Sequence, residues 1–380
     1  MKKNKLIIFM PIVNGGGVEK NFFIITNYLS KKYKEIKVIT VSKIPSHKLN
    51  KNVKVTVSTN NFLKLLGRRT LFLISLFFLF KETFHNRKVI ILCFQGIAYC
   101  TIFAKILGLK IIIRSNSSPS GWSKNILKKY LYKIIYNLAD RVIVNSIDFK
   151  RELKNKFNLN SISIYNPLNK NEILKSSKKK VGIKFFKRKS LNIISVARFS
   201  EQKDHECLIK SINILKNDFN IKLLLMGSGP EKYKINNLIK KFKLKKYIKI
   251  INFKKNPYPY IKKSDLFVLS SKYEGSPNVL LEAISLKKFV ISSDCPTGPR
   301  EILDNGKGGI LFKIGDYQML SKKIIFYIKN KKKLNKKKNY AFKRLHRFDY
   351  NKRLEEYYKA LNFYFPKKRI NRFDNNIKKS

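Results

Sequence analysis

The stretch SSKYEGSPNVLLEA, residues 270–283, joins the end of a short apolar run to the beginning of a helical pattern. A buried strand is therefore predicted to end where this stretch begins. Ser276 is a preferred N-cap residue and Pro277 suits the first helical position, so a helix is predicted to begin there. The free backbone N–H groups of Asn278 and Val279, together with the helix dipole, then form an anion site suited to a diphosphate.

Two glutamates of this stretch are separated by seven residues. Glu274 falls in the loop before the predicted helix, and Glu282 falls within it, about one and a half turns after Pro277. They can hold two ends of one polar ligand, with Glu274 at the reacting group and Glu282 at hydroxyl groups deeper in the site. The alternative is a capped helix that carries two surface carboxylates and binds no ligand.

Short apolar runs alternate with helical patterns on both sides of this stretch. Such a pattern predicts an α/β protein with parallel sheets covered by helices on both faces. The pattern fades at 169–190, where Lys and Ser accumulate, and this segment is predicted to be a linker. It separates α/β domains at 1–168 and 191–349, which a helix at 350–366 and a basic tail at 367–380 follow. Two doubly wound domains that face each other across a cleft place the carboxyl ends of both sheets against one ligand.

Further motifs occur in the same order as in a known family. Besides residues 270–283, the matching residues are Gly15 to Glu19, Asn145-Ser146, Asn166-Pro167, Val196 to Phe199 with Gln202-Lys203, Gly227 to Glu231, and Asp294 to Glu301. In these residues the chain closely resembles glycosyltransferase family 4, over about its whole length and more specifically in its second half. The resemblance implies the GT-B fold, in which two Rossmann-like domains face each other. The first domain would bind the acceptor and the second the nucleotide sugar, and the sugar would be transferred with retention of its anomeric configuration.

Departure of a nucleoside diphosphate requires positive charge at the site. The resemblance implies that no metal is bound, and the sequence contains no Asp-x-Asp motif. Arg198 and Lys203, just after a predicted strand, supply two cations, and the helix at Pro277 adds its N–H groups and dipole. These cations and Glu274 are the predicted catalytic residues, and no cofactor or metal is expected. The alternative is that both cations belong to the general surface charge of a basic chain.

The resemblance also implies how the donor is bound. Glu282 would bind the ribose hydroxyls, Glu274 would lie near the reacting carbon of the donor sugar, and Gly227 and Phe253 would border the base. The residues predicted to bind the nucleotide sugar are Gly16, Gly17, Gly227, Phe253, Ser276, Pro277, Asn278, Val279 and Glu282.

The first domain supplies two candidate regions. Gly16 and Gly17 lie in a predicted strand-to-helix loop, where glycines let the backbone approach a phosphate or acceptor closely. Many family members carry a His near the strand end that here reads IRSNSSP, residues 113–119, and this sequence has none there. Asn116 or Arg114 is a candidate for donor or acceptor contact instead. The alternative is an ordinary polar turn.

The charge is extreme for 380 residues: Lys+Arg 83 against Asp+Glu 23 give a formal net charge of +60. Hydrophobic residues make up 44%, which excludes a disordered protein. Lysines are spread along the chain and Asn and Ile are abundant, as is typical of an AT-rich genome, so part of the charge is compositional. The remainder suits anionic lipid headgroups. No nucleic-acid-binding module is recognisable, so nucleic acid is not an expected partner.

The longest apolar run, Leu71–Phe80, is shorter than the ~20 residues that a spanning helix needs. The segment 62–85 is predicted to be a core helix of the first domain, with in-plane membrane contact as the alternative. The N-terminus resembles a signal peptide but has no small-residue cleavage site. We therefore expect a cytoplasmic protein that is peripheral on the inner face of the cell membrane.

The stretch 270–283, followed by residues 294–303, looks most like family members that build bacterial surface polysaccharides. This implies transfer of a hexose or N-acetylhexosamine, commonly from a UDP-sugar, to a lipid-linked or other glycan acceptor of O-antigen, capsule or exopolysaccharide. Two other classes stay open. One is a GT-B nucleotide-sugar 2-epimerase, and the other is a non-catalytic protein that binds polyanions.

Overall fold

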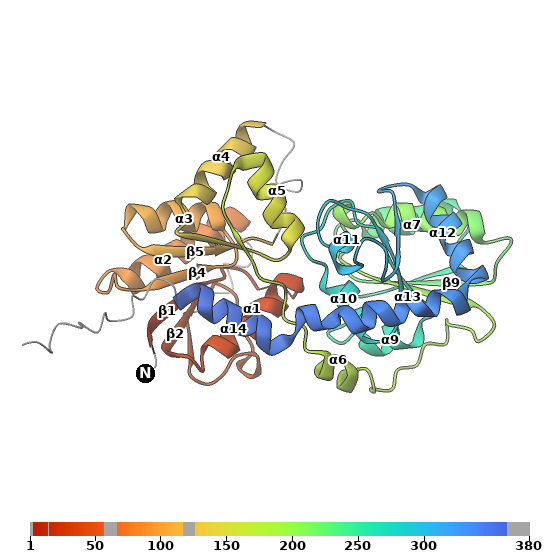
Figure 1. Ribbon diagram of the computed structural model, residues 1–380, viewed down its shortest axis with the longest axis horizontal. Helices are drawn as coiled ribbons and strands as arrows, with labels where there is room; N and C mark the ends of the chain where they lie inside the picture. The colour runs from red at the N-terminus through yellow and green to blue at the C-terminus, as the bar shows by residue number, and fades with distance from the viewer. Residues whose placement is uncertain (1–2, 14, 57–66, 117–125, 363–380) are drawn as a thin grey trace, which may run out of the picture.

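The computed structural model describes residues 3–13, 15–56, 67–116 and 126–362. The chain forms two α/β domains that lie side by side along the longest axis of the molecule (Figure 1). Each domain is a parallel sheet with helices on both faces, and each has apolar clusters of its own on the two sides of its sheet. This confirms the predicted fold class, with two Rossmann-like, doubly wound domains.

Within the described part of the first domain, seven parallel strands form one sheet in the order β3-β2-β1-β4-β5-β6-β7. The strands are β1 (Lys3–Phe9), β2 (Tyr33–Ile39), β3 (Val53–Thr56), β4 (Ile90–Cys93), β5 (Lys110–Arg114), β6 (Arg141–Val144) and β7 (Ile162–Ser163). The helices are α1 (Gly17–Leu29), α2 (Arg68–Thr83), α3 (Ile97–Ile106), α4 (Ile126–Leu138) and α5 (Ile147–Phe157). Strand β4 is apolar throughout because helices cover both of its faces.

In the second domain, whose residues 191–344 are all described, six parallel strands form a sheet in the order β10-β9-β8-β11-β12-β13. The strands are β8 (Leu191–Val196), β9 (Ile221–Met226), β10 (Ile248–Ile251), β11 (Leu266–Leu269), β12 (Phe289–Ser293) and β13 (Ile310–Phe312). The helices are α7 (His205–Leu215), α8 (Lys232–Lys241), α9 (Tyr258–Lys263), α10 (Asn278–Ser285), α11 (Pro299–Ile302), α12 (Tyr317–Lys329) and α13 (Lys331–Arg344).

The strand order reverses once in each sheet, and these two places position the predicted site. Strand β1 lies between β2 and β4, and β8 lies between β9 and β11. At such a switch point the loops from neighbouring strands diverge and leave a crevice at the carboxyl edge of the sheet. The predicted glycine loop follows β1, residues 198–203 follow β8, and the loop with Glu274 follows β11. The topology therefore places the glycine loop at the carboxyl edge of the first sheet and the other two segments at the carboxyl edge of the second.

The segment 169–190, predicted to be a linker, contains helix α6 (Lys170–Ser176). The side chain of Asn169 accepts a hydrogen bond from the backbone N–H of Glu172 at 3.1 Å, and Ile173 is buried against the second domain. The sequence pattern missed this helix because seven residues show too little of the helical period.

Helix α14 (Tyr350–Asn362) returns to the first domain although it follows the second sheet in sequence (Figure 1). Leu354 and Tyr357 are buried in the same apolar cluster as Phe22 of α1. The predicted C-terminal helix is therefore part of the first domain's packing. Residues 363–366 of the predicted helix and the predicted basic tail at 367–380 lie outside the described residues.

Helix α2 occupies most of the segment predicted as a helix at 62–85. It buries Phe72 and Leu79 against the first domain, as predicted for a core helix, and it exposes Phe77 on its other side. Residues 62–66 lie outside the described residues. Among the helices that the structure describes, none is both long enough and apolar enough to cross a bilayer.

The contact between α14 and β5 leads to a stability prediction. The Tyr357 hydroxyl accepts a hydrogen bond from Nε of the fully buried Arg114 at 2.8 Å. Tyr357→Phe leaves this charged donor without its partner, so we expect the free energy of unfolding to fall by about 1–3 kcal/mol. Tyr358→Phe, which removes a hydroxyl without a hydrogen bond to any described residue, should change it by less than about 0.5 kcal/mol. Urea unfolding measures both variants, and equal effects would contradict the assigned contact.

Candidate active site

Glycines lie at two places where the domains contact each other. A Cβ atom added to Gly275 would lie 2.5 Å from the backbone oxygen of Asn116, so only glycine allows this approach of the loops after β5 and β11. Gly16 is the N-cap of α1 and Gly17 is its first residue. The side-chain amide of Asn278 donates a hydrogen bond to the Gly17 carbonyl oxygen at 3.3 Å. The predicted glycine loop and the predicted helix start therefore face each other across the cleft.

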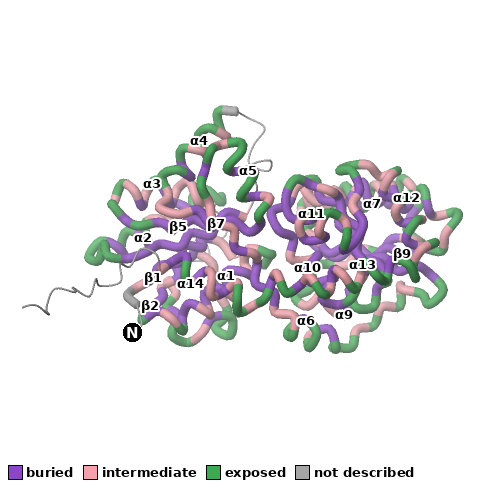
Figure 2. Tube along the Cα trace, viewed as in Figure 1, coloured by how far each residue is buried: buried purple, intermediate pink, exposed green. Residues whose placement is uncertain are grey.

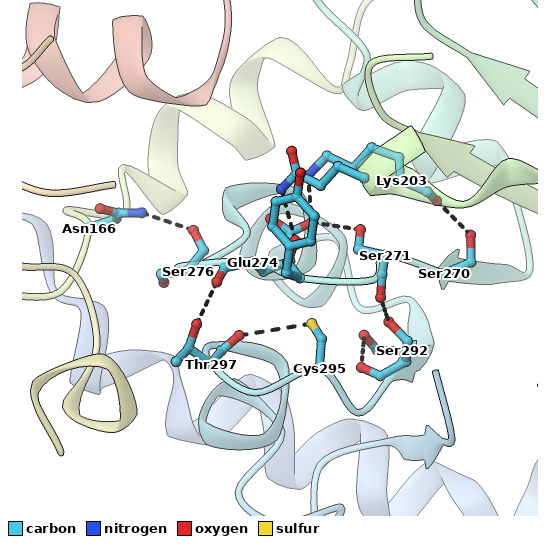
Figure 3. Close-up of polar contacts among 12 residues, drawn as sticks. Asn166, Lys203, Ser270, Ser271, Glu274, Ser276, Ser292, Cys295 and Thr297 are labelled. Atoms are coloured by element: carbon cyan, nitrogen blue, oxygen red, sulfur yellow. Dashed lines mark hydrogen bonds and ion pairs between the residues drawn. The ribbon is translucent and has the colours of Figure 1, made fainter. Parts of the chain in front are cut away.

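Glu274 is a buried carboxylate at this edge, with 7% of its surface exposed. Its Oε1 atom accepts hydrogen bonds from Lys203 Nζ at 2.5 Å and from Ser271 Oγ at 2.7 Å (Figure 3). Its backbone oxygen accepts a hydrogen bond from the Thr297 hydroxyl. The structure therefore brings two of the three predicted catalytic residues, Glu274 and Lys203, into direct contact.

Backbone contacts fix the position of Lys203. It ends the 3₁₀ turn η4, which spans residues 201–203, and its backbone oxygen accepts a hydrogen bond from Ser270 Oγ at 3.0 Å. The side chain of Gln202 donates to the backbone oxygen of Tyr273 at 2.8 Å. The loop after β8 is therefore hydrogen-bonded to the loop after β11, and the ammonium group of Lys203 is directed at Glu274.

Three other predicted residues follow β8, β9 and β10. Arg198 is exposed, and its guanidinium makes no hydrogen bond or ion pair with any described residue. A Cβ atom added to Gly227 would lie 1.9 Å from the Ala197 backbone oxygen, so no side chain fits there. Phe253 is exposed. No hydrogen bond joins these residues to Glu274, so the structure leaves Arg198 apart from the other two predicted catalytic residues.

Glu282 is buried, with 5% of its surface exposed, and its partner comes from the other domain. Its Oε1 atom accepts hydrogen bonds from Lys20 Nζ at 2.6 Å and from the Tyr258 hydroxyl at 3.4 Å. Lys20 Nζ also donates to the Tyr258 hydroxyl at 2.8 Å. No described residue donates to the second oxygen, Oε2, which leaves an acceptor for a hydroxyl group of a ligand.

The charge of Glu282 raises the pKa of both Lys20 and Tyr258. Burial lowers the pKa of Lys20, but the Glu282 carboxylate and Tyr258 more than offset this, so the pKa is raised above its usual value. Burial, and then the charge of Glu282, raise the pKa of Tyr258 to about 12. Lys20 therefore stays protonated at neutral pH. The sequence analysis missed Lys20, although it is the first basic residue after the glycine loop.

Helix α10 begins one residue later than predicted. Pro277, predicted to be the first helical residue, is the N-cap with extended backbone angles, and Ser276, predicted to be the N-cap, makes no capping hydrogen bond. The N-cap prediction was wrong because the Ser276 backbone oxygen instead accepts a hydrogen bond from the Asn166 side chain at 3.1 Å. The backbone N–H groups of Asn278 and Val279 have no acceptor among the described residues, as the predicted anion site requires.

Arg114 and Asn116 occupy different environments. The Arg114 guanidinium is fully buried and donates to the side-chain oxygens of Asn116 and Asn166, the latter at 2.7 Å, and to the Tyr357 hydroxyl. The amide of Asn166 in turn donates to Asn278 Oδ1 at 2.7 Å. Arg114 therefore orients two asparagines at the cleft, while Asn116 itself lies beside the loop after β11.

Residues 176–344 match the family described as "Glycosyl transferases group 1". The second domain is thus similar to group 1 glycosyltransferases. The match contains the Glu274–Lys203 pair and all of α10, but it leaves Lys20 and Arg114 outside. The predicted resemblance to GT-B glycosyltransferases is thereby confirmed, and the assignment to family 4 stays a prediction.

Several proteins that are similar in sequence to this chain are named as glycosyltransferases. The chain is 36% identical over 180 residues to an uncharacterized glycosyltransferase of Methanocaldococcus jannaschii, covering 45% of this chain and 44% of the relative. It is 27% identical over 261 residues to the N-acetylgalactosamine-N,N'-diacetylbacillosaminyl-diphospho-undecaprenol 4-alpha-N-acetylgalactosaminyltransferase of Campylobacter jejuni, covering 66% and 70%. A capsular polysaccharide biosynthesis glycosyltransferase of Staphylococcus aureus is 29% identical, with 61% of each chain covered. The chain thus spans under half of the first relative.

Solved structures share the complete fold. Anabaena HepE, solved in complex with UDP, matches with a TM-score of 0.73 and 18% identity over 95% of this chain and 100% of that one. Sucrose-phosphate synthase from Thermosynechococcus elongatus matches with a TM-score of 0.78 and 16% identity over 94% and 98%. At these identities the likeness concerns the fold alone, and it confirms the predicted GT-B architecture.

The contact between Lys20 and Glu282 predicts an energetic coupling between the domains. Lys20→Met leaves a buried carboxylate without its cation, so we expect the free energy of unfolding to fall by about 1–3 kcal/mol, less than for a fully buried pair. Glu282→Gln in the same chain should recover part of this loss. A double-mutant cycle in urea measures a coupling of at least about 0.5 kcal/mol if the two groups interact.

Lys31→Met is the matched control for this cycle. Lys31 lies just after α1, is exposed, and its side chain makes no hydrogen bond or ion pair with a described residue. Its substitution should change the free energy of unfolding by less than about 0.5 kcal/mol and show no coupling to Glu282→Gln. Strict additivity of Lys20→Met and Glu282→Gln would contradict the ion pair.

Proposed function

We propose that this protein is a retaining glycosyltransferase that moves a hexose or N-acetylhexosamine from a UDP-sugar to a lipid-linked or other glycan acceptor in surface polysaccharide biosynthesis. The observation that carries the proposal is the contact between the buried Glu274 and Lys203 near the start of α10, inside the segment that matches group 1 glycosyltransferases. A carboxylate suits the positive charge that develops on the sugar, and a lysine suits the negative charge of the departing diphosphate.

The names of related proteins support the two substrate classes. Anabaena HepE has been solved with UDP and with UDP-glucose, which supports a UDP-sugar as the donor here. The Campylobacter jejuni relative is named for an acceptor linked through a diphosphate to undecaprenol, which supports a lipid-linked glycan as the acceptor. The second domain would bind the donor, and the first domain would present the acceptor.

In this proposal the leaving group is neutralised by cations and by α10. Lys203 and Arg198 approach the diphosphate, and the unpaired N–H groups of Asn278 and Val279 bind its oxygens. Glu274 faces the reacting carbon, as nucleophile or as electrostatic stabiliser of the transition state. A leaving phosphate oxygen accepts the proton of the acceptor hydroxyl on the same face, so retaining transfer needs no separate general base.

The nucleoside lies further along the cleft. The ribose hydroxyls donate to the second oxygen of Glu282, which Lys20 leaves available, and the base lies between Gly227 and Phe253. Lys20 would then hold Glu282 in its charged, acceptor-only form. The first domain would thereby take part in nucleotide binding through one lysine.

We also propose that the protein works at the cytoplasmic surface of the membrane. A lipid-linked acceptor cannot leave the bilayer, so the enzyme must approach it there. The net charge of +60 supports attraction to anionic headgroups, each well-placed cation contributing about 1 kcal/mol.

Substituting each of the two cleft glutamates in turn separates the sugar-transfer step from nucleotide binding. Glu274→Gln should abolish transfer with nearly unchanged affinity for UDP, because that side chain faces the sugar. Glu282→Ala should weaken UDP binding by about 1–3 kcal/mol, the scale of a lost charged hydrogen bond. Protection from thermal unfolding by UDP-, GDP- and ADP-sugars identifies the nucleotide, and calorimetry with it measures affinity.

The products decide between the functional classes. Free UDP together with a new glycosidic bond is the expected result. A sugar inverted at C2 without a new bond would identify an epimerase instead, and no protection by any nucleotide sugar would favour a polyanion-binding protein. Equal losses of UDP affinity in the two glutamate variants would contradict the assigned roles.

We propose that no resident metal takes part, so turnover should survive excess EDTA. Lys203→Ala and Arg198→Ala should each lower the rate by about 10²–10³-fold, as loss of a preorganised charge donor does elsewhere. Lys272→Ala is the control: it removes an exposed lysine of the neighbouring loop after β11, 3.1 Å from Glu201, and should leave the rate within about twofold. Loss of activity in EDTA with rescue by manganese would overturn the metal-free account.

A further inference from the structure

Three neighbouring helices of the first domain expose apolar side chains that its core does not use. On α2, and on the residue that follows it, these are Leu73, Phe77, Phe80 and Phe84. Their spacing of four, three and four residues places them on one side of the helix. Another side, with Phe72 and Leu79, is buried within the first domain. Helix α2 is therefore apolar on two sides, and only one of them packs on the protein.

Helix α4 repeats this arrangement. Its exposed apolar residues are Leu127, Tyr130, Leu131, Ile134 and Leu138, and Leu127 is 79% exposed. They recur at helical spacing along one side. Ile135 and Tyr136 are buried on another side. Packing on the first sheet thus accounts for only part of the apolar surface of α4.

Helix α3 lies between the other two and joins their exposed rows into one surface. It packs against both α2 and α4, and the rings of Phe72 and Tyr99 lie 5.7 Å apart. It exposes Ile102 and Ile106, the latter by 78%. Figure 2 shows the three helices largely exposed along one border of the first domain. We use the name apolar face for the exposed apolar residues of these three helices, which are Leu73, Phe77, Phe80, Phe84, Ile102, Ile106, Leu127, Tyr130, Leu131, Ile134 and Leu138.

The concentration of such residues is local. In the part of the chain that the structure describes, eleven of the eighteen large apolar side chains that are exposed belong to the apolar face. The other seven are distributed over both domains, singly. Scattered exposed apolar residues need no explanation, but a contiguous patch indicates a surface that contacts a membrane or a protein.

The charges around the apolar face indicate which of these it contacts. From residue 68 to residue 140 the sequence has only two acidic residues, Glu82 and Asp140. Glu82 is paired with Lys5 and Lys37, and Asp140 is paired with Lys105 at 2.7 Å. The remaining charges on these helices are basic; they are Arg68, Arg69, Lys81, Lys128, Lys129 and Lys133.

This charge pattern disfavours a second copy of the chain as the occupant. A two-fold interface would bring the apolar face against itself and set its lysines and arginines against the same cations. Like charges across an interface cost free energy, whereas the headgroups of an anionic bilayer complement them. Apolar side chains bordered by lysine also match the composition of helices that lie in the plane of a membrane.

We propose that the apolar face docks on an anionic lipid bilayer, with its apolar side chains inserted at headgroup level. This rests on the proposed function in one respect: a lipid-linked acceptor would enter from the same surface. Helices α3 and α4 begin after the carboxyl ends of β4 and β5, the edge that faces the cleft, so the docked face borders the site. Docking combines insertion with charge, so it should resist salt better than a purely electrostatic contact.

Vesicle flotation tests the surface directly. Leu131→Asp with Ile134→Asp should lower partitioning to phosphatidylglycerol-containing vesicles by about tenfold or more, because two inserted side chains become charged. Ile214→Asp with Tyr233→Asp, on exposed positions of the second domain, is the matched control and should lower it by less than twofold. At 1 M salt, where the Debye length is ~3 Å, the unmodified protein should keep at least about a third of its binding.

A fluorescent label locates the inserted residues independently. All four native cysteines are buried, so Ile134→Cys supplies a single accessible thiol for an environment-sensitive dye. The dye should shift to the blue on anionic vesicles, and the same dye at Tyr233→Cys should not. Equal shifts at both positions, or equal losses in the two Asp pairs, would overturn the proposal.

The remaining outcomes keep this proposal separate from the proposed function. Self-association without lipid that the Leu131 and Ile134 substitutions abolish would overturn the bilayer in favour of a second copy. Absence of vesicle binding by the unmodified protein would also overturn it. Protection by UDP-sugars from thermal unfolding should be the same in both Asp pairs, so failure of that protection in the unmodified protein counts against the enzyme assignment alone.

Discussion

Two carboxylates buried at the cleft impose the constraint on which the site depends. An ionised carboxylate removed from water is costly unless a cation and hydrogen bonds compensate it, so Glu274 and Glu282 each require a partner. Lys203 reaches Glu274 from the neighbouring loop of the same domain. Lys20 reaches Glu282 from α1 of the other domain. Because that second lysine crosses the cleft, the need to compensate Glu282 also fixes how the two domains face each other.

Polar contacts, rather than a shared apolar core, join the domains elsewhere. The backbone N–H groups of Ile147 and Asp148, at the start of α5, donate to the Glu301 carboxylate at 3.0 and 3.1 Å, and Tyr165 donates to it as well. Two apolar clusters lie within each domain, and only the returning helix α14 joins a cluster of the first domain from the far end of the chain. A ligand can therefore replace contacts in the cleft without exposing a core, because water and ligand oxygens satisfy the same polar groups.

The surface shows why composition alone gives a weak indication of function. Lysines are distributed over the whole chain, and a net charge of +60 locates no partner. The exposure of individual side chains does locate a surface, because the exposed apolar residues concentrate on α2, α3 and α4. That face and the cleft meet at the carboxyl edge of the first sheet. There the loop after a strand lies at the site, and the helix that follows this loop lies at the surface.

Local sequence by itself determined the alternation of strands and helices, the two domains' fold class and the approximate start of α10. It also indicated Glu274 and Lys203, because each follows a predicted strand at a motif position that resembles glycosyltransferase family 4. The parallel topology then brings their loops together. Only the tertiary structure decided that Lys20 compensates Glu282, that Arg114 is buried beneath Asn116 and Asn166, and that α14 completes the first domain. The Lys20–Glu282 contact joins residues 262 positions apart. A periodic pattern reports only which side of an element is buried, whereas the partner of a buried charge depends on which distant element packs beside it.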